Sequence, residues 1–118
     1  MENPFPPFVF DLPQKDYGFD GLTVHADHSA IGETYFVFAE KELHFPENAH
    51  GAQWTVVISG KCDFTADGKT TSYKKGDTYY ILTGLKHQIT LYPGYAEVDY
   101  TLKTDSDGRV PRKIDRDL

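Results

Sequence analysis

The sequence has little cysteine and no excess of positive charge. Cys62 is the single cysteine among 118 residues, so neither an intrachain disulfide nor a site built on several thiolates can form. The 18 acidic residues outnumber the 12 basic ones, which leaves a formal net charge of −6. A surface of this sign repels a phosphate backbone, so we expect no nucleic-acid partner.

Long apolar runs are also missing. No uninterrupted apolar stretch approaches the roughly 18 residues that a membrane-spanning helix needs. Residues 1–4 lack a basic stretch followed by an apolar one, so the start of the chain does not resemble a secretory signal. These absences predict a cytoplasmic protein without a membrane partner.

Several catalytic motifs are absent. The sequence contains no Gly-x-Ser-x-Gly elbow, no glycine-rich phosphate loop, no His-Glu-x-x-His and no pair of carboxylates at a recognisable acid–base spacing. We therefore expect neither nucleophilic hydrolysis nor nucleotide chemistry.

Aromatic and β-branched residues are plentiful, and they alternate with period two. Trp54, Val56 and Ile58 lie on one side of a predicted strand and Gln53 on the other, and residues 95–102 alternate in the same way. Similar short runs occur at 22–26, 35–39, 62–65, 70–73, 78–82 and 87–92. Asp67-Gly68 suits a tight hairpin between two of them, and no helical stripe is present. The pattern predicts an all-β antiparallel sandwich or barrel.

The chain length predicts one domain over residues 1–118, with its core at about 20–102. The apolar segment 5–10, stiffened by Pro6 and Pro7, is expected to pack on its own barrel or on a neighbouring subunit. The segment 103–118 carries charges of both signs and is expected to be a solvated tail.

Three polar residues are candidates for a common site. Gln53 lies opposite the apolar side of its strand, and His50 precedes it by three residues in the adjoining loop. His87 shares a side with Ile89 on another strand. If all three point into the mouth of a barrel, two imidazoles and an amide oxygen form a set of ligands for a divalent cation of borderline softness. The alternative without a ligand site is that His50 is an ordinary loop histidine and His87 a hydrogen-bonded histidine of the core.

Two segments carry a resemblance to the cupins. Gly76, five residues, then Leu82-Thr83-Gly84, two residues and His87 resembles the second cupin segment, with Leu82 in the place of proline. In the first segment, Asn48-x-His50-x-x-Gln53 is followed after six residues by Gly60. Asn48 replaces the first histidine, Gln53 replaces glutamate, and the spacer before Gln53 is shorter than in the family.

The resemblance implies a single-domain antiparallel β-barrel, or double-stranded β-helix, of jelly-roll type. It also implies a divalent transition metal (Zn, Ni, Fe or Mn) held by His50, Gln53 and His87, with Asn48 and Glu47 as weaker candidates. Loss of one imidazole and one carboxylate weakens such a site, so an empty or vestigial site remains an alternative.

Three functions follow as expectations. The first is binding of an oxygen-rich or anionic small molecule, with Lewis-acid chemistry of the kind carried out by cupin dioxygenases, isomerases or lyases. The second is a non-catalytic metabolite-binding module. The third is an interaction protein acting through its N-terminal arm. Cupins commonly dimerise, so the resemblance also implies a homodimer. His25 and His28 flank Asp27, and we expect both to lie in a solvated loop rather than in the site. His44 could face either the pocket or solvent. Cys62 is expected to be a small buried side chain.

Overall fold

The computed structural model describes residues 2–102, so the predicted charged tail lies outside the described residues. In chain order the elements are η1 (Pro7–Asp11), β1 (Gln14–Lys15), β2 (Leu22–His28), β3 (Gly32–Ala39), β4 (Leu43–Asn48), β5 (Gln53–Ser59), β6 (Lys61–Ala66), β7 (Lys69–Lys74), β8 (Thr78–Ile81), β9 (His87–Leu91) and β10 (Ala96–Leu102). No helix within this described part is long and apolar enough to cross a membrane.

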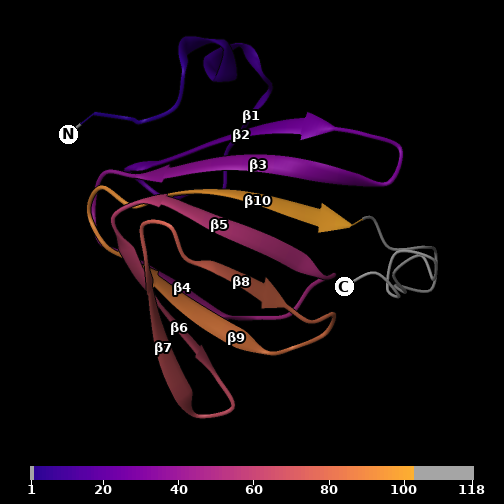
Figure 1. Cartoon of the computed structure of the whole chain (residues 1–118), viewed down its shortest axis with the longest axis vertical. Coiled ribbons are helices and arrows are strands. Elements are labelled where there is room, and N and C mark those ends of the chain that lie inside the picture. The colour runs from indigo at the N-terminus through magenta and orange to yellow at the C-terminus, as the bar shows by residue number, and fades with distance from the viewer. Residues whose placement is uncertain (1, 103–118) are drawn as a thin grey trace.

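The strands form two antiparallel sheets (Figure 1). The larger sheet has the order β1-β2-β3-β10-β5-β8, and the smaller has the order β4-β9-β6-β7. Neighbours such as β3 and β10 are distant in sequence, as in a jelly roll. The predicted all-β antiparallel fold is confirmed, but backbone pairing does not close the two sheets into one barrel.

The strand alternation places an unusual set of side chains between the sheets. On β5 and β10 it is the polar half, including Gln53, Glu97 and Asp99, that faces the interior and lines a cavity. Trp54 faces outward with 45% of its surface exposed. The interior at this end is therefore a hollow of mixed lining, in which these polar side chains lie among apolar ones such as Val37 and Ile89.

A packed apolar core adjoins this cavity, and some of its members also line the cavity wall. Its buried members come from both sheets: Ala39, Leu43, Val57, Cys62, Phe64, Tyr79, Ile81, Leu91 and Tyr95. Cys62 is fully buried, as predicted, and burial raises the pKa of its thiol to about 11. A thiol of this kind stays protonated at neutral pH and is unreactive.

The predicted hairpin at Asp67-Gly68 is confirmed. Asp67 has φ 53° and Gly68 has φ 72°, the two left-handed positions of a turn whose twist matches its flanking strands. The turn joins β6 to β7, which pair in register from Lys61↔Lys74 to Ala66↔Lys69.

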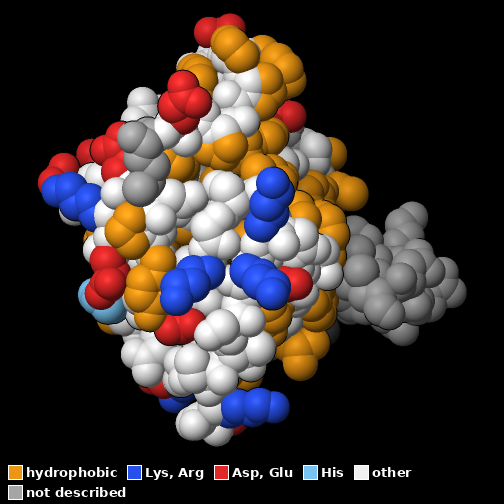
Figure 2. All heavy atoms as spheres, turned by 60° about the vertical axis from the view of Figure 1, so that its left-hand side comes forward, with side chains coloured by type: hydrophobic (Ala, Val, Ile, Leu, Met, Phe, Trp, Pro, Cys, Tyr) orange, Lys and Arg blue, Asp and Glu red, His pale blue; other side chains and the backbone are white. Residues whose placement is uncertain are grey.

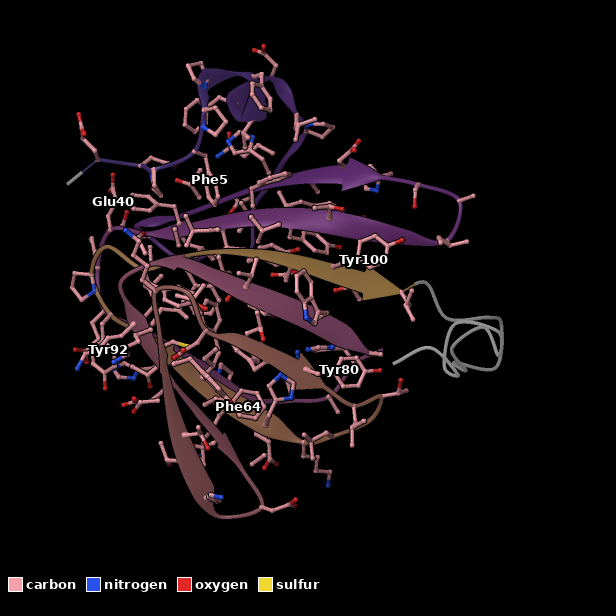
Figure 3. All side chains as sticks on the ribbon, viewed as in Figure 1. Phe5, Glu40, Phe64, Tyr80, Tyr92 and Tyr100 are labelled. Atoms are coloured by element: carbon pink, nitrogen blue, oxygen red, sulfur yellow. The ribbon has the colours of Figure 1, made fainter. Side chains whose placement is uncertain are left out.

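The N-terminal arm packs on its own sheet. Phe5 meets Phe36 of β3 edge to face at 5.5 Å between ring centroids, and Val9 is buried at 1% exposure. Phe8 remains 70% exposed, and Figure 2 shows hydrophobic side chains gathered at the end of the molecule where the arm lies. Of the two predicted locations, the arm therefore takes the one on its own chain, over β2 and β3 (Figure 3).

Candidate functional site

A cavity of about 660 Å³ opens between the two sheets, with walls from both. All five residues named as candidate ligands line it: Glu47, Asn48, His50, Gln53 and His87. All five therefore share one cavity, and their role as metal ligands stays a prediction.

Backbone carbonyls fix the orientation of both imidazoles. Nδ1 of His50 lies 2.7 Å from the carbonyl oxygen of Gly51, and Nδ1 of His87 lies 2.8 Å from that of Leu85. A carbonyl only accepts hydrogen bonds, so each neutral ring must carry its hydrogen on Nδ1. Each Nε2 is then left with a free lone pair. The two rings stand 4.8 Å apart and perpendicular to each other.

The loops that carry the two histidines are joined by their backbones. The N–H of Gly84 donates to the carbonyl of His50 at 2.9 Å. Gly84 has φ +77°, a left-handed conformation that favours glycine, and it turns the chain just before His87. This motif glycine therefore holds the two histidine loops together.

Gln53 presents its amide oxygen. Its Nε2 donates to Oγ1 of Thr55 at 2.9 Å, and Thr55 is fully buried. This hydrogen bond fixes the amide so that the nitrogen is occupied and Oε1 remains available as a ligand.

Asn48 and Glu47 lie at the exposed rim of the cavity. Asn48 pairs with His87 in the register of β4 and β9, but its Oδ1 already accepts a hydrogen bond from the N–H of Ala49 at 2.8 Å. Glu47 is exposed to solvent. Both residues are therefore weaker candidates than the other three, which agrees with their ranking from the sequence.

The remaining histidines lie outside the cavity. His44 is exposed and contacts Thr90 and Glu42, and His28 is exposed and pairs with Glu33. The expectation that His25 lies in a solvated loop is wrong. It sits buried in β2, where its Nδ1 bonds the Leu12 carbonyl at 3.0 Å, because the N-terminal arm covers that strand.

The donor set fits a borderline divalent cation. Two Nε2 lone pairs and an amide oxygen line one cavity, and Nδ1–H bonds to carbonyls are the usual support of histidines that bind metals. Within residues 2–102, no three His, Cys, Asp or Glu side chains form a metal-holding group. The set that fits therefore contains two imidazoles and Gln53, and it carries no negative charge.

Sequence reasoning missed a pair of carboxyl groups in the same cavity. Glu97 and Asp99 are buried on the inner face of β10, and both line the cavity. Oε1 of Glu97 accepts hydrogen bonds from the hydroxyl of Tyr95 at 2.6 Å and from that of Tyr79 at 3.3 Å. The signal was available in the alternation of 95–102, which puts both carboxyls opposite Val98 and Tyr100.

Burial controls the proton affinity of Asp99. Loss of solvent raises its pKa well above the ordinary value, and the hydrogen bond and negative charge of Glu97 raise the pKa further. Asp99 therefore keeps a proton in the folded protein at pH values where an exposed aspartate has lost it.

This shift predicts the pH dependence of stability. Between the ordinary aspartate pKa of about 3.9 and the raised pKa, the folded state binds more protons, so stability falls as pH rises. Asp99→Asn removes the ionisable carboxyl, so the variant does not lose this stability as the pH rises. The variant should exceed the wild type at pH 7 by an amount in the usual range of about 0.5–3 kcal/mol, and the difference should vanish near pH 3. Urea unfolding across this pH range measures it.

Asp63→Asn is the matched control of opposite sign. Hydrogen bonds from Ser72 and Tyr92 lower the pKa of Asp63, so its contribution is present at neutral pH and is lost as the pH falls. This variant should be less stable than the wild type at pH 7. If the two substitutions shifted stability in the same direction at pH 7, the assignment of a bound proton to Asp99 would be wrong.

Comparison with known proteins identifies the family. Residues 34–91 match the family described as Cupin domain, and no curated protein is similar enough in sequence to match the chain. An RmlC-like cupin from Shewanella frigidimarina aligns over 83% of this chain and 89% of its own, at 18% identity and a TM-score of 0.70. KdgF from Halomonas sp. aligns over 83% and 92%, at 16% identity and a TM-score of 0.69.

A third structure, the EutQ protein of Clostridium difficile, aligns over 75% of this chain and 74% of its own, at 24% identity and a TM-score of 0.57. At these identities the likeness concerns the fold. The matched segment spans β3 to β9 almost completely, including both histidine loops and the hairpin between them. Together, the family match and the shared architecture show that the chain belongs to the cupin superfamily.

Proposed function

We propose that the cavity binds a divalent transition metal through Nε2 of His50, Nε2 of His87 and Oε1 of Gln53, and that the metal anchors a small oxygen-rich ligand. The observation that carries this proposal is the pair of Nδ1 hydrogen bonds to carbonyls, at 2.7 and 2.8 Å, which leaves both Nε2 atoms with lone pairs in one cavity. Members of the superfamily often bind a divalent metal, which agrees with it.

When bound, the cation supplies Lewis-acid polarisation of ligand oxygens. The residues supply orientation: Thr55 fixes the Gln53 amide, and the carbonyls of Gly51 and Leu85 fix the imidazoles. The ligand set is neutral, so the full charge of the cation remains available to a ligand. The set also lacks the carboxylate of the common iron sites that activate dioxygen, which favours non-oxidative chemistry.

The charges around the cavity limit the ligand. Its walls within residues 2–102 contain Glu47, Glu97 and Asp99 and no lysine or arginine. An anionic ligand therefore depends on the cation for its binding energy, whereas a neutral polyol or hydroxycarbonyl compound does not meet this repulsion. The alternative of a metal-free metabolite-binding module predicts the opposite, since binding would then be independent of added metal.

Metal analysis tests the proposal. Purified protein should bind about one equivalent of Zn²⁺ or Ni²⁺ in a calorimetric titration, and His50→Ala and His87→Ala should each weaken binding by at least about 100-fold, since loss of even an outer-shell partner typically costs 10–100-fold. His44→Ala, which removes an exposed histidine outside the cavity, should bind as the wild type does. A wild type that binds no metal, or variants with unchanged affinity, would overturn the proposal.

We also propose that two copies of the chain pair through the outer face of the larger sheet. Tyr100, Trp54 and Tyr80 lie in cross-strand register on β10, β5 and β8, and they are partly exposed around an apolar hollow. Within the described residues, the N-terminal arm packs on β3 through Phe5 and Phe36 rather than on this aromatic row. A second copy offers the same aromatic row to a twofold contact.

Sedimentation velocity tests this pairing. The wild type should sediment as a dimer at micromolar concentration, and Trp54→Lys should shift it to the monomer because like charges would face each other across the twofold axis. A monomeric wild type would contradict the pairing without affecting the metal proposal.

A further inference from the structure

The Glu97–Asp99 pair has no part in the proposed ligand set, yet it is built into the wall of the same cavity. Asp99 is only 5% exposed, and within the described chain its carboxyl is hydrogen-bonded to no side chain other than Glu97. A buried carboxyl whose single partner is a second acid is costly to keep, because neither can donate unless one of them is protonated. The pair is therefore a proton-sharing unit that faces a cavity.

The two carboxyls occupy different environments. Oε1 of Glu97 is held by the hydroxyls of Tyr95 and Tyr79, which stabilise a negative charge on Glu97. Among the side chains of residues 2–102, no comparable donor reaches Asp99. The arrangement puts the charge on Glu97 and the proton on Asp99. It is the asymmetry that lets neighbouring carboxyls act as acid and base.

Titratable groups on the surrounding elements do not neutralise the pair. Tyr17, in the loop after β1, and Tyr35, on β3, line the cavity, and Asp99 is among the groups that raise the pKa of each phenol. Glu33 on β3 adds further negative charge near these tyrosines. No lysine or arginine among the described lining residues competes for the carboxylate. The phenols of Tyr17 and Tyr35 therefore stay neutral, and the proton shared by Glu97 and Asp99 is the one that this part of the cavity can transfer.

Strand register relates the pair to the ligand set. In the pairing of β10 with β5, Asp99 is opposite Thr55 and Thr101 is opposite Gln53. Asp99 and Gln53 are therefore diagonal neighbours on one sheet face, about 7–8 Å apart at their backbones. A ligand of a few heavy atoms that is bound at Gln53 is long enough to reach Asp99.

We propose that Glu97 and Asp99 are the acid–base pair of this cavity, moving a proton on and off a carbon of a small enolisable carbonyl compound that chelates at His50, Gln53 and His87. This inference rests on the proposed function, which supplies the anchor for the carbonyl and an adjacent oxygen. It adds the reaction class, which is proton transfer next to a carbonyl, as in isomerisation or tautomerisation.

The proton transfer balances without a co-reactant. The C–H bond next to the carbonyl breaks, its proton goes to the Glu97 carboxylate, and its electron pair forms a carbon–carbon double bond as the carbonyl becomes an enolate. Asp99 then gives its proton to the enolate at the same carbon. In a hydroxycarbonyl compound whose hydroxyl proton passes to the enolate oxygen, Asp99 can instead give its proton to the former carbonyl carbon, and the hydroxyl carbon becomes the new carbonyl. Redistribution of the remaining proton within the pair restores the starting state, with one proton shared and nothing oxidised or reduced.

Deuterium exchange tests the chemistry. Zn²⁺-loaded wild type in D₂O should exchange the C–H hydrogens of hydroxyacetone, followed by proton NMR, faster than the same concentration of Zn²⁺ with His87→Ala. Glu97→Gln and Asp99→Asn should each lower the rate by about 100-fold or more, the usual range for loss of an acid–base group, while Zn²⁺ still binds. Asp63→Asn, which removes a carboxyl on β6 outside the cavity, should exchange at the wild-type rate.

Infrared spectroscopy gives a readout that needs no metal and no ligand. Metal-free wild type at pH 7 should show the C=O stretch of a protonated carboxylic acid, and the band should be absent from Asp99→Asn and present in Asp63→Asn. Absence of the band from the wild type would overturn the inference.

The outcomes separate this inference from the proposed function. Wild type that binds Zn²⁺ but does not accelerate exchange overturns the acid–base pair and leaves the metal site standing. Loss of Zn²⁺ binding in Asp99→Asn or Glu97→Gln also overturns it, because the carboxyls would then serve to hold the cation. Failure of the wild type to bind Zn²⁺ overturns the proposed function itself.

Discussion

Gly60→Ala is expected to destabilise the protein by about 3–5 kcal/mol, at the upper end of what single substitutions do. A Cβ at this position would lie 2.7 Å from Cα and 2.8 Å from the backbone nitrogen of Tyr95. Both are backbone atoms in the packed core, so neither can move aside cheaply. Gly60 also has φ +70°, where an alanine adds a cost of about 1–2 kcal/mol. Since folded domains are stable by only about 5–15 kcal/mol, this substitution should remove a large share of the free energy of unfolding.

Gly76→Ala is the matched control. Gly76 has φ +91°, a left-handed conformation like that of Gly60, but a Cβ there would meet no atom within 4 Å. Only the conformational cost of about 1–2 kcal/mol applies. Urea unfolding of the two variants separates the clash from the backbone strain. Equal losses in the two variants would show that contact with Tyr95 is not what requires a glycine at position 60.

These two glycines also show how much of the fold the sequence could predict. Gly60 and Gly76 were recognised as motif positions, and the strands on either side follow from period-two alternation and from turn residues such as Asp67-Gly68. Local chemistry suffices there, because a left-handed turn or a run of β-branched residues has few alternatives. The close approach of Gly60 to Tyr95 could not be predicted, since it depends on how two distant segments pack.

The candidate site was likewise only partly predictable from the sequence. His50, Gln53 and His87 line one cavity, as their spacing suggested, because motif loops and strand alternation set their direction. Glu97 and Asp99 were overlooked, because alternation says which residues share a face and does not say which face is inside. In this molecule the apolar face of β10 is outside, so the usual assumption that acidic residues face solvent fails. The family resemblance gave no help, since β10 lies beyond the matched segment.

Phe64→Ala is expected to lower both stability and metal affinity. Phe64 is buried, and it projects from β6 into the space between the sheets (Figure 3). Its ring stacks on that of His87 at 5.3 Å with an interplanar angle of 19°, and it contacts Tyr79 at 5.6 Å. Truncation leaves a cavity in the core, which typically costs 3–5 kcal/mol. It also removes the surface against which the His87 imidazole lies, so the ring gains freedom that metal binding must then remove.

Phe64→Leu separates the two effects. Leucine fills most of the volume, so stability should fall by less than in the alanine variant, but it offers no flat face to the imidazole. We therefore expect Phe64→Leu to fold well and to bind Zn²⁺ about 10-fold more weakly than the wild type, the lower end of the range for residues that support a ligand. Urea unfolding and calorimetric titration at a temperature where the variant is folded measure both quantities. If folded Phe64→Leu bound Zn²⁺ as tightly as the wild type, the hydrogen bond from Nδ1 of His87 to the Leu85 carbonyl would be enough to orient the imidazole. The stacked ring of Phe64 would then contribute nothing to metal affinity.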